Sequence, residues 1–136
     1  MYATVEDLKN FQGVVVPKFF WNEENINKCQ GFIVLKGEEK VAIAFSSCIS
    51  GNKLEIGIET KEGHRREGLG TIAAKALIDY SLENNYQVIW ACKHDNYQSL
   101  NSAKKVGFEK VFEGPYFEVL KLSKINKFNK KGIVNL

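Results

Sequence analysis

The sequence predicts an α/β fold with one mixed sheet, and three observations support this fold class. Three strand-like runs separated by short turns fill residues 32–60, which is typical of an antiparallel meander. A helical pattern over residues 71–84 leads to an apolar run over residues 87–92, which indicates a strand–helix–strand crossover. A second helical pattern and two more strand-like runs follow. The expected α+β mixed sheet therefore combines an antiparallel meander, one crossover and a C-terminal strand pair.

Two short helices are expected in residues 1–30. Thr4 is followed three residues later by Asp7, a pairing typical of the start of a helix. Asn22 precedes two acids that suit the positive end of a second helix, which runs to about Cys29. Pro17 separates the two helices, because proline disfavours helix in the residue before it.

Each later element has its own signal. Apolar runs divided by turn-forming residues predict meander strands at 32–36, 41–49 and 53–60. The helix over 71–84 has a wide apolar face and should be buried, and the nearly unbroken apolar run 87–92 is typical of a strand covered on both faces. Residues 96–106 predict another helix that ends at Gly107, and final strands are expected at 108–112 and 116–122.

Length and composition limit the classes of protein that the chain can represent. Its 136 residues, 44% apolar and 26% charged, match one ordinary globular domain, which we place at residues 1–122. No window reaches the roughly 18 apolar residues of a membrane span, and the N-terminus lacks the pattern of a secretory signal. Cys29, Cys48 and Cys92 lack metal-like spacing, which favours reduced, packed thiols in a cytoplasmic protein. Neither a metal nor a membrane partner is expected.

The excess positive charge is confined to one end of the chain. Residues 1–120 contain 14 Lys and Arg against 16 Asp and Glu, whereas residues 121–136 add five lysines and no acid. A nucleic-acid-binding domain carries positive charge along a folded face, so the lysine-rich tail, residues 123–136, favours a solvated terminus. We therefore expect no nucleic acid partner, with binding through the tail as a minor alternative.

The segment between the third strand and the long helix carries the clearest chemical signal. Gly68 and Gly70 lie where a helix begins, which leaves backbone N–H groups free and lets a ligand approach closely. The helix dipole and the guanidinium groups of Arg65 and Arg66 add positive potential there. The segment fits neither a P-loop nor a dinucleotide-binding fingerprint. It favours a phosphate or pyrophosphate site, and a plain turn with a helix cap is the alternative.

A second polar segment lies at the start of the next predicted helix. Asn96 and Ser99 can both cap that helix, and Asn96 could also offer its amide to a ligand between the two helices. Capping alone would explain both residues. The helix is followed by Gly107 and Phe108.

These segments resemble the GNAT superfamily of acyl-CoA-dependent N-acyltransferases. The spacing Arg65-x-x-Gly68-x-Gly70 is similar to the family's pyrophosphate loop, and Asn96-x-x-Ser99 with the later Gly-Phe pair is similar to its second signature. The resemblance covers residues 31–122, and the detail IGIETKEGHRREGLG is closest to the branch of zwittermicin-resistance-type acetyltransferases.

The resemblance implies an acetyl-CoA site built from the loop, the strand before it and the second helix. The pyrophosphate would lie on backbone N–H groups of the loop, and the pantetheine arm would pair with the strand. The strands 53–60 and 87–92 would splay apart around the acyl group, and the second helix would flank the far side. The residues implied for cofactor binding are Ile58, Glu59, Thr60, Arg65, Arg66, Glu67, Gly68, Leu69, Gly70, Thr71, Asn96 and Ser99.

The implied reaction is direct attack of a neutral amine on the thioester carbonyl in a ternary complex, which demands positioning and removal of a proton. Glu55 and Glu59 are the candidate bases, because their spacing places both on one face of the strand. If that face is solvated, both are ordinary surface acids. His64 could also serve, although a loop histidine is more often merely exposed, and Cys92 is expected to pack rather than to carry an acyl group.

Two departures from the family pattern affect this expectation. Relatives often place a tyrosine, the acid that protonates the leaving thiolate, where this chain has Ala103. Tyr97 or a water could take that role, or no acid is needed because a CoA thiolate is a fairly good leaving group. The segment before the meander is short, so part of the acceptor wall would be absent or come from another subunit. A sheet edge exposed there would favour a homodimer.

The favoured function is transfer of an acetyl group from acetyl-CoA to a primary amine of a small molecule or peptide. The alternative is a catalytically inactive CoA-binding module that acts as a sensor or interaction domain. The slightly acidic body suits a cationic amine, but its charge is too small to decide the acceptor.

Overall fold

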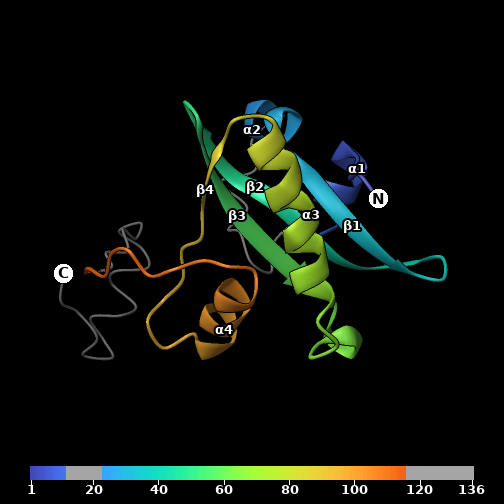
Figure 1. Cartoon of the computed structure of the whole chain (residues 1–136). Helices are drawn as coiled ribbons and strands as arrows, with labels where there is room; N and C mark the ends of the chain where they lie inside the picture. Colours follow the sequence, from blue (N-terminus) through green and yellow to red (C-terminus); the bar gives the residue numbers. More distant parts are fainter. Residues whose placement is uncertain (12–22, 116–136) are drawn as a thin grey trace, which may run out of the picture.

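A four-stranded mixed sheet forms the centre of the structure, a computed structural model that describes residues 1–11 and 23–115 (Figure 1). The strand order is β1 (Gly31–Lys36), β2 (Glu39–Ser50), β3 (Lys53–Thr60) and β4 (Gln87–Ile89). The first three strands are antiparallel neighbours, and β4 is parallel to β3. The predicted meander, crossover and mixed sheet are therefore confirmed.

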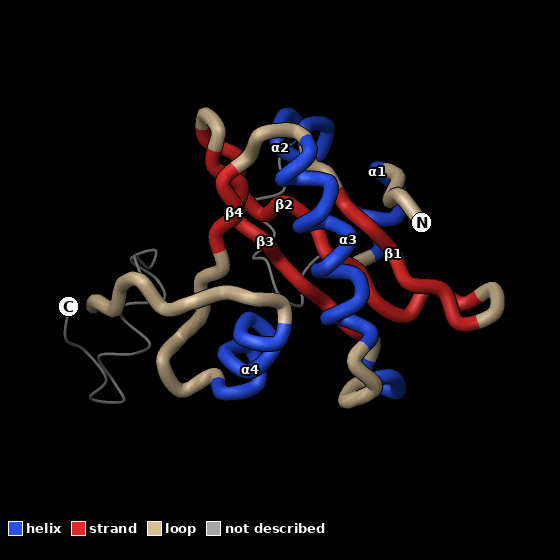
Figure 2. The backbone as a smooth tube through the Cα atoms, viewed as in Figure 1, coloured by secondary structure: helices blue, strands red, loops and turns tan. Residues whose placement is uncertain are grey.

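Helices cover both faces of the sheet. The long helix α3 (Leu69–Glu83) runs along one face, as Figure 2 shows, and α1 (Val5–Asn10) and α2 (Glu23–Lys28) contribute to the apolar cluster on the other. The helix α4 (Tyr97–Lys105) lies beyond the sheet, at the end where β3 stops and α3 starts (Figure 1). The fully buried members of the α3 cluster include Ala44, Leu54, Ala74 and Leu77, and the other cluster contains Leu8, Phe11, Ile26, Ile33, Ile43 and Phe45.

The alternation of β3 separates its side chains between the two faces. Residues 54, 56 and 58 belong to the α3 cluster, so Glu55 and Glu59 lie on the opposite face, as their spacing predicts. Gly57 lies between them on that face. A Cβ atom at Gly57 would lie 2.5 Å from the ring of Phe45, so only glycine fits beneath this ring.

A capping box anchors α1, as the spacing of Thr4 and Asp7 predicts. Thr4 Oγ1 accepts a hydrogen bond from the Asp7 N–H (3.2 Å), and Asp7 Oδ2 accepts one from the Thr4 N–H (2.9 Å). The buried Asp7 also accepts a hydrogen bond from Lys40 of β2. Burial opposes the charged form, but the hydrogen bonds from Lys40 and Thr4 outweigh it and hold the pKa of Asp7 below its usual value.

The strand after α3 differs from the expectation. Only residues 87–89 of the expected strand 87–92 pair with β3, and Gln87 and Ile89 are exposed. Val88 contacts the α3 cluster, but nothing in the other cluster belongs to β4. The expected cover on both faces is therefore wrong. Among the described strands β4 is the last in the sheet, and the helices opposite α3 pack over β1 and β2.

The first of the two expected C-terminal strands is also wrong. Residues 106–115 contain only turns and irregular backbone, and Val111 and Phe112 are 94% and 81% exposed. Apolar residues alone did not make a strand here, since none of the strands within residues 1–11 and 23–115 pairs with this segment. The second expected strand, 116–122, the break at Pro17 and the tail 123–136 lie outside the described residues.

The cysteines only partly match the expectation of packed thiols. Cys29 packs against the α1 and α2 cluster, and burial raises the pKa of its thiol to about 11. Cys48 and Cys92 are exposed, and all three thiols are free. Within the described ranges, no helix is long and apolar enough to cross a bilayer.

Candidate functional site

The loop between β3 and α3 has the backbone geometry of an anion site. After a 3₁₀ turn (Glu62–His64), Arg66 and Gly68 adopt positive φ angles of 69° and 76°. Gly68 is the N-cap of α3, and the first turn of this fully described helix contains no acidic residue. The first N–H groups of α3 have neither an intrahelical acceptor nor a capping side chain. Together with the helix dipole, they are suited to bind an anion.

The start of α3 rests directly on the end of β3. A Cβ atom at Gly70 would lie 2.9 Å from Ile58 Cγ2 and 3.0 Å from Thr60 Oγ1, so this close approach requires glycine. At Gly68, by contrast, a Cβ atom would meet nothing within 4 Å, which leaves this side of the loop open. Leu69, Gly70 and Thr71 form the first turn of α3 and are half-buried.

β3 and β4 are paired only at one end and then separate, which leaves one edge of β3 open. The pairing between the two strands ends at Glu55 and Ile89, whereas β3 continues to Thr60. On its other side β3 pairs with β2 along its whole length. Among the described strands, the backbone of residues 56–60 therefore has no partner on the side of β4. That backbone is free to pair with an extended ligand.

Glu59 is a buried carboxyl group next to this edge. It is 8% exposed, and within the described chain its Oε2 atom is buried without a hydrogen-bond partner. Burial raises the pKa of Glu59 above its usual value, and the positive charge of Arg65 opposes this in part. The Arg65 Nε–H donates to the carbonyl oxygen of Thr60 at 3.4 Å. Glu55, on the same face, is half-buried.

The residues expected on the second helix have local partners. The Ser99 N–H donates to Asn96 Oδ1 (3.1 Å), so Asn96 caps α4, and the Trp90 indole N–H donates to Ser99 Oγ (2.9 Å). Tyr97 is 70% exposed. The capping role of Asn96 is confirmed, whereas contact of Asn96, Ser99 or Tyr97 with substrates stays a prediction.

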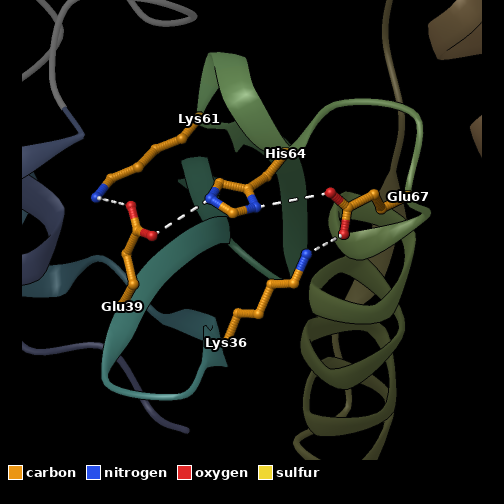
Figure 3. A network of polar contacts seen from close by, with 5 residues as sticks. All are labelled: Lys36, Glu39, Lys61, His64 and Glu67. Carbon is orange, nitrogen blue, oxygen red and sulfur yellow. Dashed lines mark hydrogen bonds and ion pairs between the residues drawn. The ribbon is translucent and has the colours of Figure 1, made fainter.

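A network of polar side chains connects this loop to the turn between β1 and β2 (Figure 3). Lys36 Nζ lies 2.8 Å from Glu67 Oε2, and the His64 ring lies between two carboxylates: Nδ1 is 3.7 Å from Glu67 and Nε2 is 3.3 Å from Glu39. Lys61 Nζ completes the network, 3.3 Å from Glu39 Oε1. Glu67 thus pairs with a side chain outside its own loop.

Sequence reasoning found only part of this network. His64 and Glu67 were identified through their place in or beside the loop, but Lys36, Glu39 and Lys61 were not singled out. Lys36 and Glu67 are 31 residues apart, and Glu39 and Lys61 are 22 apart. Sequence spacing carries no signal for such contacts, because they depend on how the first hairpin lies against the loop. Within the described part of the chain, no group of His, Cys, Asp and Glu is placed to hold a metal ion.

Strands β3 and β4 separate at one end of the sheet, and a loop suited to an anion lies at the start of the long helix, as the resemblance to GNAT acetyltransferases predicts. The family model described as GNAT acetyltransferase matches residues 7–117. The chain therefore belongs to the GNAT acetyltransferase family. Its finer relation to zwittermicin-resistance-type members stays a prediction.

Two curated relatives come from Bacillus subtilis. The chain is 33% identical over 96 residues to the uncharacterized N-acetyltransferase YdfB, and the aligned region covers 69% of this chain and 37% of YdfB. It is 39% identical over 57 residues to the uncharacterized N-acetyltransferase YjdG, covering 40% of this chain and 34% of YjdG. The aligned regions thus span about a third of the length of each of these relatives.

Solved structures share the fold. A GCN5-related N-acetyltransferase-like protein from Streptococcus suis has a TM-score of 0.58 at 28% identity, covering 63% of this chain and 34% of that one. The aminoglycoside N-acetyltransferase AAC(6')-Iy, solved with CoA, has a TM-score of 0.64 at 13% identity, covering 89% and 98%. At that low identity the second match speaks for the fold alone.

Proposed function

We propose that this chain transfers an acetyl group from acetyl-CoA to a primary amine of a small molecule or peptide, in the cytoplasm. One observation carries the proposal: the open N-terminus of α3 rests on the end of β3, beside the strand edge that β4 leaves free. Membership of the GNAT acetyltransferase family supports the same activity.

The residues present fit acetyl-CoA. The N–H groups from Arg66 to Thr71, with the guanidinium of Arg65, would bind the pyrophosphate, because they combine free donors with positive charge. The backbone of residues 58–60 would pair with the pantetheine amides, and the thioester would then lie where β3 and β4 separate. The open space at Gly68 leaves room for the phosphates.

The chemistry requires one proton acceptor. In the proposed step, the Glu59 carboxylate takes a proton from the substrate ammonium, and the neutral nitrogen attacks the thioester carbonyl carbon. The new C–N bond forms, the C–S bond breaks, and the nitrogen's second proton passes to the thiolate through water or the exposed Tyr97. Glu59 then releases its proton to solvent. The raised pKa of Glu59 suits this role, because it brings the base closer to the pKa of an amine. Glu55 is the second candidate, half-buried on the same face.

A small-molecule amine is the favoured acceptor. Two of the similar folds are aminoglycoside acetyltransferases, one solved with sisomicin and one with a bisubstrate analogue of CoA and acetylneamine. The buried carboxyl group of Glu59 would also attract a cationic amine.

One observation favours the alternative, a CoA-binding module without turnover. Ala103, at the position where relatives often place the tyrosine acid, is buried at 8% exposure and packs in the fold rather than facing a substrate. This module would bind acetyl-CoA but release no thiol with any amine.

Calorimetric titration of acetyl-CoA into the wild type, Gly68→Glu and Gly51→Glu tests the proposal. Gly51 is the matched control, because it also has a positive φ (58°) and open space at its Cβ position but lies in the β2–β3 turn. Both variants carry the same strain and charge. We expect Gly68→Glu to abolish binding and Gly51→Glu to retain it.

A screen of primary amines with detection of free thiol then separates enzyme from module. Thiol release that requires both acetyl-CoA and an amine supports the transferase. Failure of the folded wild type to bind acetyl-CoA would refute both functions.

A further inference from the structure

Glu67 is an unexpected residue in a loop that would bind an anion. Glu67 lies in the chain between Arg66 and Gly68, whose backbone N–H groups are proposed to donate to the pyrophosphate, so its carboxylate lies close to them. An uncompensated negative charge there would repel the phosphates, because charges closer than the Debye length of about 8 Å are incompletely screened. The structure compensates this charge from outside the loop.

Lys36 supplies the compensation, and the His64 ring lies beside the same carboxylate. Lys36 Nζ donates to Glu67 Oε2, and the His64 ring lies beside the other oxygen. The hydrogen bond from Lys36 is the main reason why the pKa of Glu67 lies below its usual value, so the carboxylate is charged at neutral pH. Lys36 belongs to the end of β1, so the pair fixes the loop against a strand of the sheet.

The ion pairs of the network contribute little to the free energy of folding. The side chains of Lys36 and Glu67 are 57% and 40% exposed, and ion pairs this exposed contribute little to folding. The loop itself, however, needs support, because Arg66 holds a left-handed backbone conformation that non-glycine residues avoid. The His64 ring is 20% exposed and contacts Glu39 as well, which connects the loop to the β1–β2 turn.

We propose that Lys36 and His64 are positioning residues for acetyl-CoA: both hold Glu67 against the β1–β2 hairpin, and Lys36 cancels its charge beside the pyrophosphate. The proposal rests on the function proposed above and deepens it. Neither residue needs to touch the cofactor. Their effect is on the shape and the electrostatic potential of the loop.

The test measures the Kd of acetyl-CoA and of acetyl-pantetheine, which has the same acyl arm but no phosphate. Lys36→Met should weaken acetyl-CoA binding about fivefold. His64→Leu should weaken it less, because it removes only a contact to Glu67, and acetyl-pantetheine binding should be unaffected by either change. Lys61→Met is the matched control. It removes the same charge from the same network, but its partner is Glu39 rather than Glu67, so it should have little effect.

The double variant Lys36→Met/Glu67→Gln distinguishes compensation from direct contact. If Lys36 acts by cancelling Glu67, removing both charges restores acetyl-CoA affinity to near that of the wild type. If the ammonium binds phosphate itself, the double variant stays as weak as Lys36→Met, and the proposal is overturned.

The remaining outcomes are equally decisive. Equal weakening by Lys36→Met and Lys61→Met would mean that only the general charge of the surface matters, which overturns the proposal. Unchanged affinity in Lys36→Met overturns it as well, while wild-type binding of acetyl-CoA leaves the proposed function intact. A folded wild type that binds no acetyl-CoA overturns both, so the two failures are distinguishable.

Discussion

The two sides of the candidate site are held in very different ways. The loop side rests on the core, since Gly70 packs directly on Ile58 and Thr60 and the helix behind it is anchored by the fully buried Leu77. On the α4 side, the helix has a single buried residue, Ala103. Trp90, which precedes α4, donates a hydrogen bond from its indole N–H to Ser99, and its ring packs edge-on against Phe108, which follows the helix. The comparison indicates that the candidate loop is preorganised, whereas α4 can adjust at low free-energy cost.

The largest contrast is expected from truncating one leucine on each side. Leu77→Ala removes a fully buried side chain from α3 and should lower the free energy of unfolding by about 3 kcal/mol. Leu100→Ala truncates a half-buried side chain of α4 and should lower it by less than about 1 kcal/mol. Urea denaturation of both variants checks the pair. Equal losses would show that α4 is as firmly packed as α3.

The next effect concerns catalysis on the loop side. Glu59→Gln should lower kcat about 100-fold through loss of the base, yet raise the free energy of unfolding, because a buried carboxylate with an unpaired oxygen is unfavourable. In the wild type, activity should rise with pH through an apparent pKa above the usual glutamate value of 4.5.

Steady-state kinetics over a pH series and urea denaturation measure these changes. Glu55→Gln is the matched control on the same face, where the side chain is less buried. A larger loss of kcat in Glu55→Gln than in Glu59→Gln would transfer the role of base to Glu55.

A smaller effect is expected from a carboxylate that anchors the N-terminal helix to the sheet. Asp7→Asn should cost about 2 kcal/mol at neutral pH, because Asp7 accepts hydrogen bonds from Lys40 and Thr4 as an anion. The folded pKa of Asp7 is depressed, so its contribution is fully present above the unfolded value of 3.8 and is lost as pH falls through the folded pKa below that.

Unfolding measured between neutral and acidic pH should therefore show the wild-type advantage disappearing in acid. Glu113→Gln provides the contrast beyond α4. Its pair with Lys110 is exposed on both sides, and we expect no measurable change at either pH. An advantage of Asp7 that persisted in strong acid would contradict the assignment.

The smallest predicted effect lies at the contact between Trp90 and α4. Ser99→Ala removes the acceptor of the Trp90 indole N–H and should cost about 1 kcal/mol, with a shift of that indole resonance in NMR spectra. Ser102→Ala is the control, because its hydroxyl donates to Gln98 within the helix. A shift of equal size in both variants would mean that Trp90 senses helix fraying rather than the lost bond.

Local signals in the sequence were enough for much of the fold. The box of Thr4 and Asp7, the turns that separate the meander strands and the capping of α4 by Asn96 all depend on residues within a few positions of each other. The candidate loop was found for the same reason, since Gly68 and Gly70 lie within one segment and mark both a turn and a close approach.

The failures share a different cause, namely dependence on distant parts of the chain. Residues 108–112 have a strand-like composition, yet they pair with none of the four described strands. The exposure of Cys92 and Ile89 depends on which strands the N-terminal helices cover. The pair between Lys36 and Glu67 requires the placement of a hairpin against a loop. None of these is encoded at a fixed spacing.

The close contact between Gly57 and Phe45 constrains the order in which this sequence can change. Any side chain at position 57 overlaps the phenylalanine ring, whereas a smaller residue at position 45 leaves only a cavity. A Cβ atom at position 57 requires the close-packed ring of Phe45 to shift, whereas a smaller residue at position 45 requires no atom to move. Under random mutagenesis, position 57 should therefore vary only after position 45 has lost its ring. The strand that carries Glu55 and Glu59 thus keeps its glycine for as long as its neighbour remains aromatic.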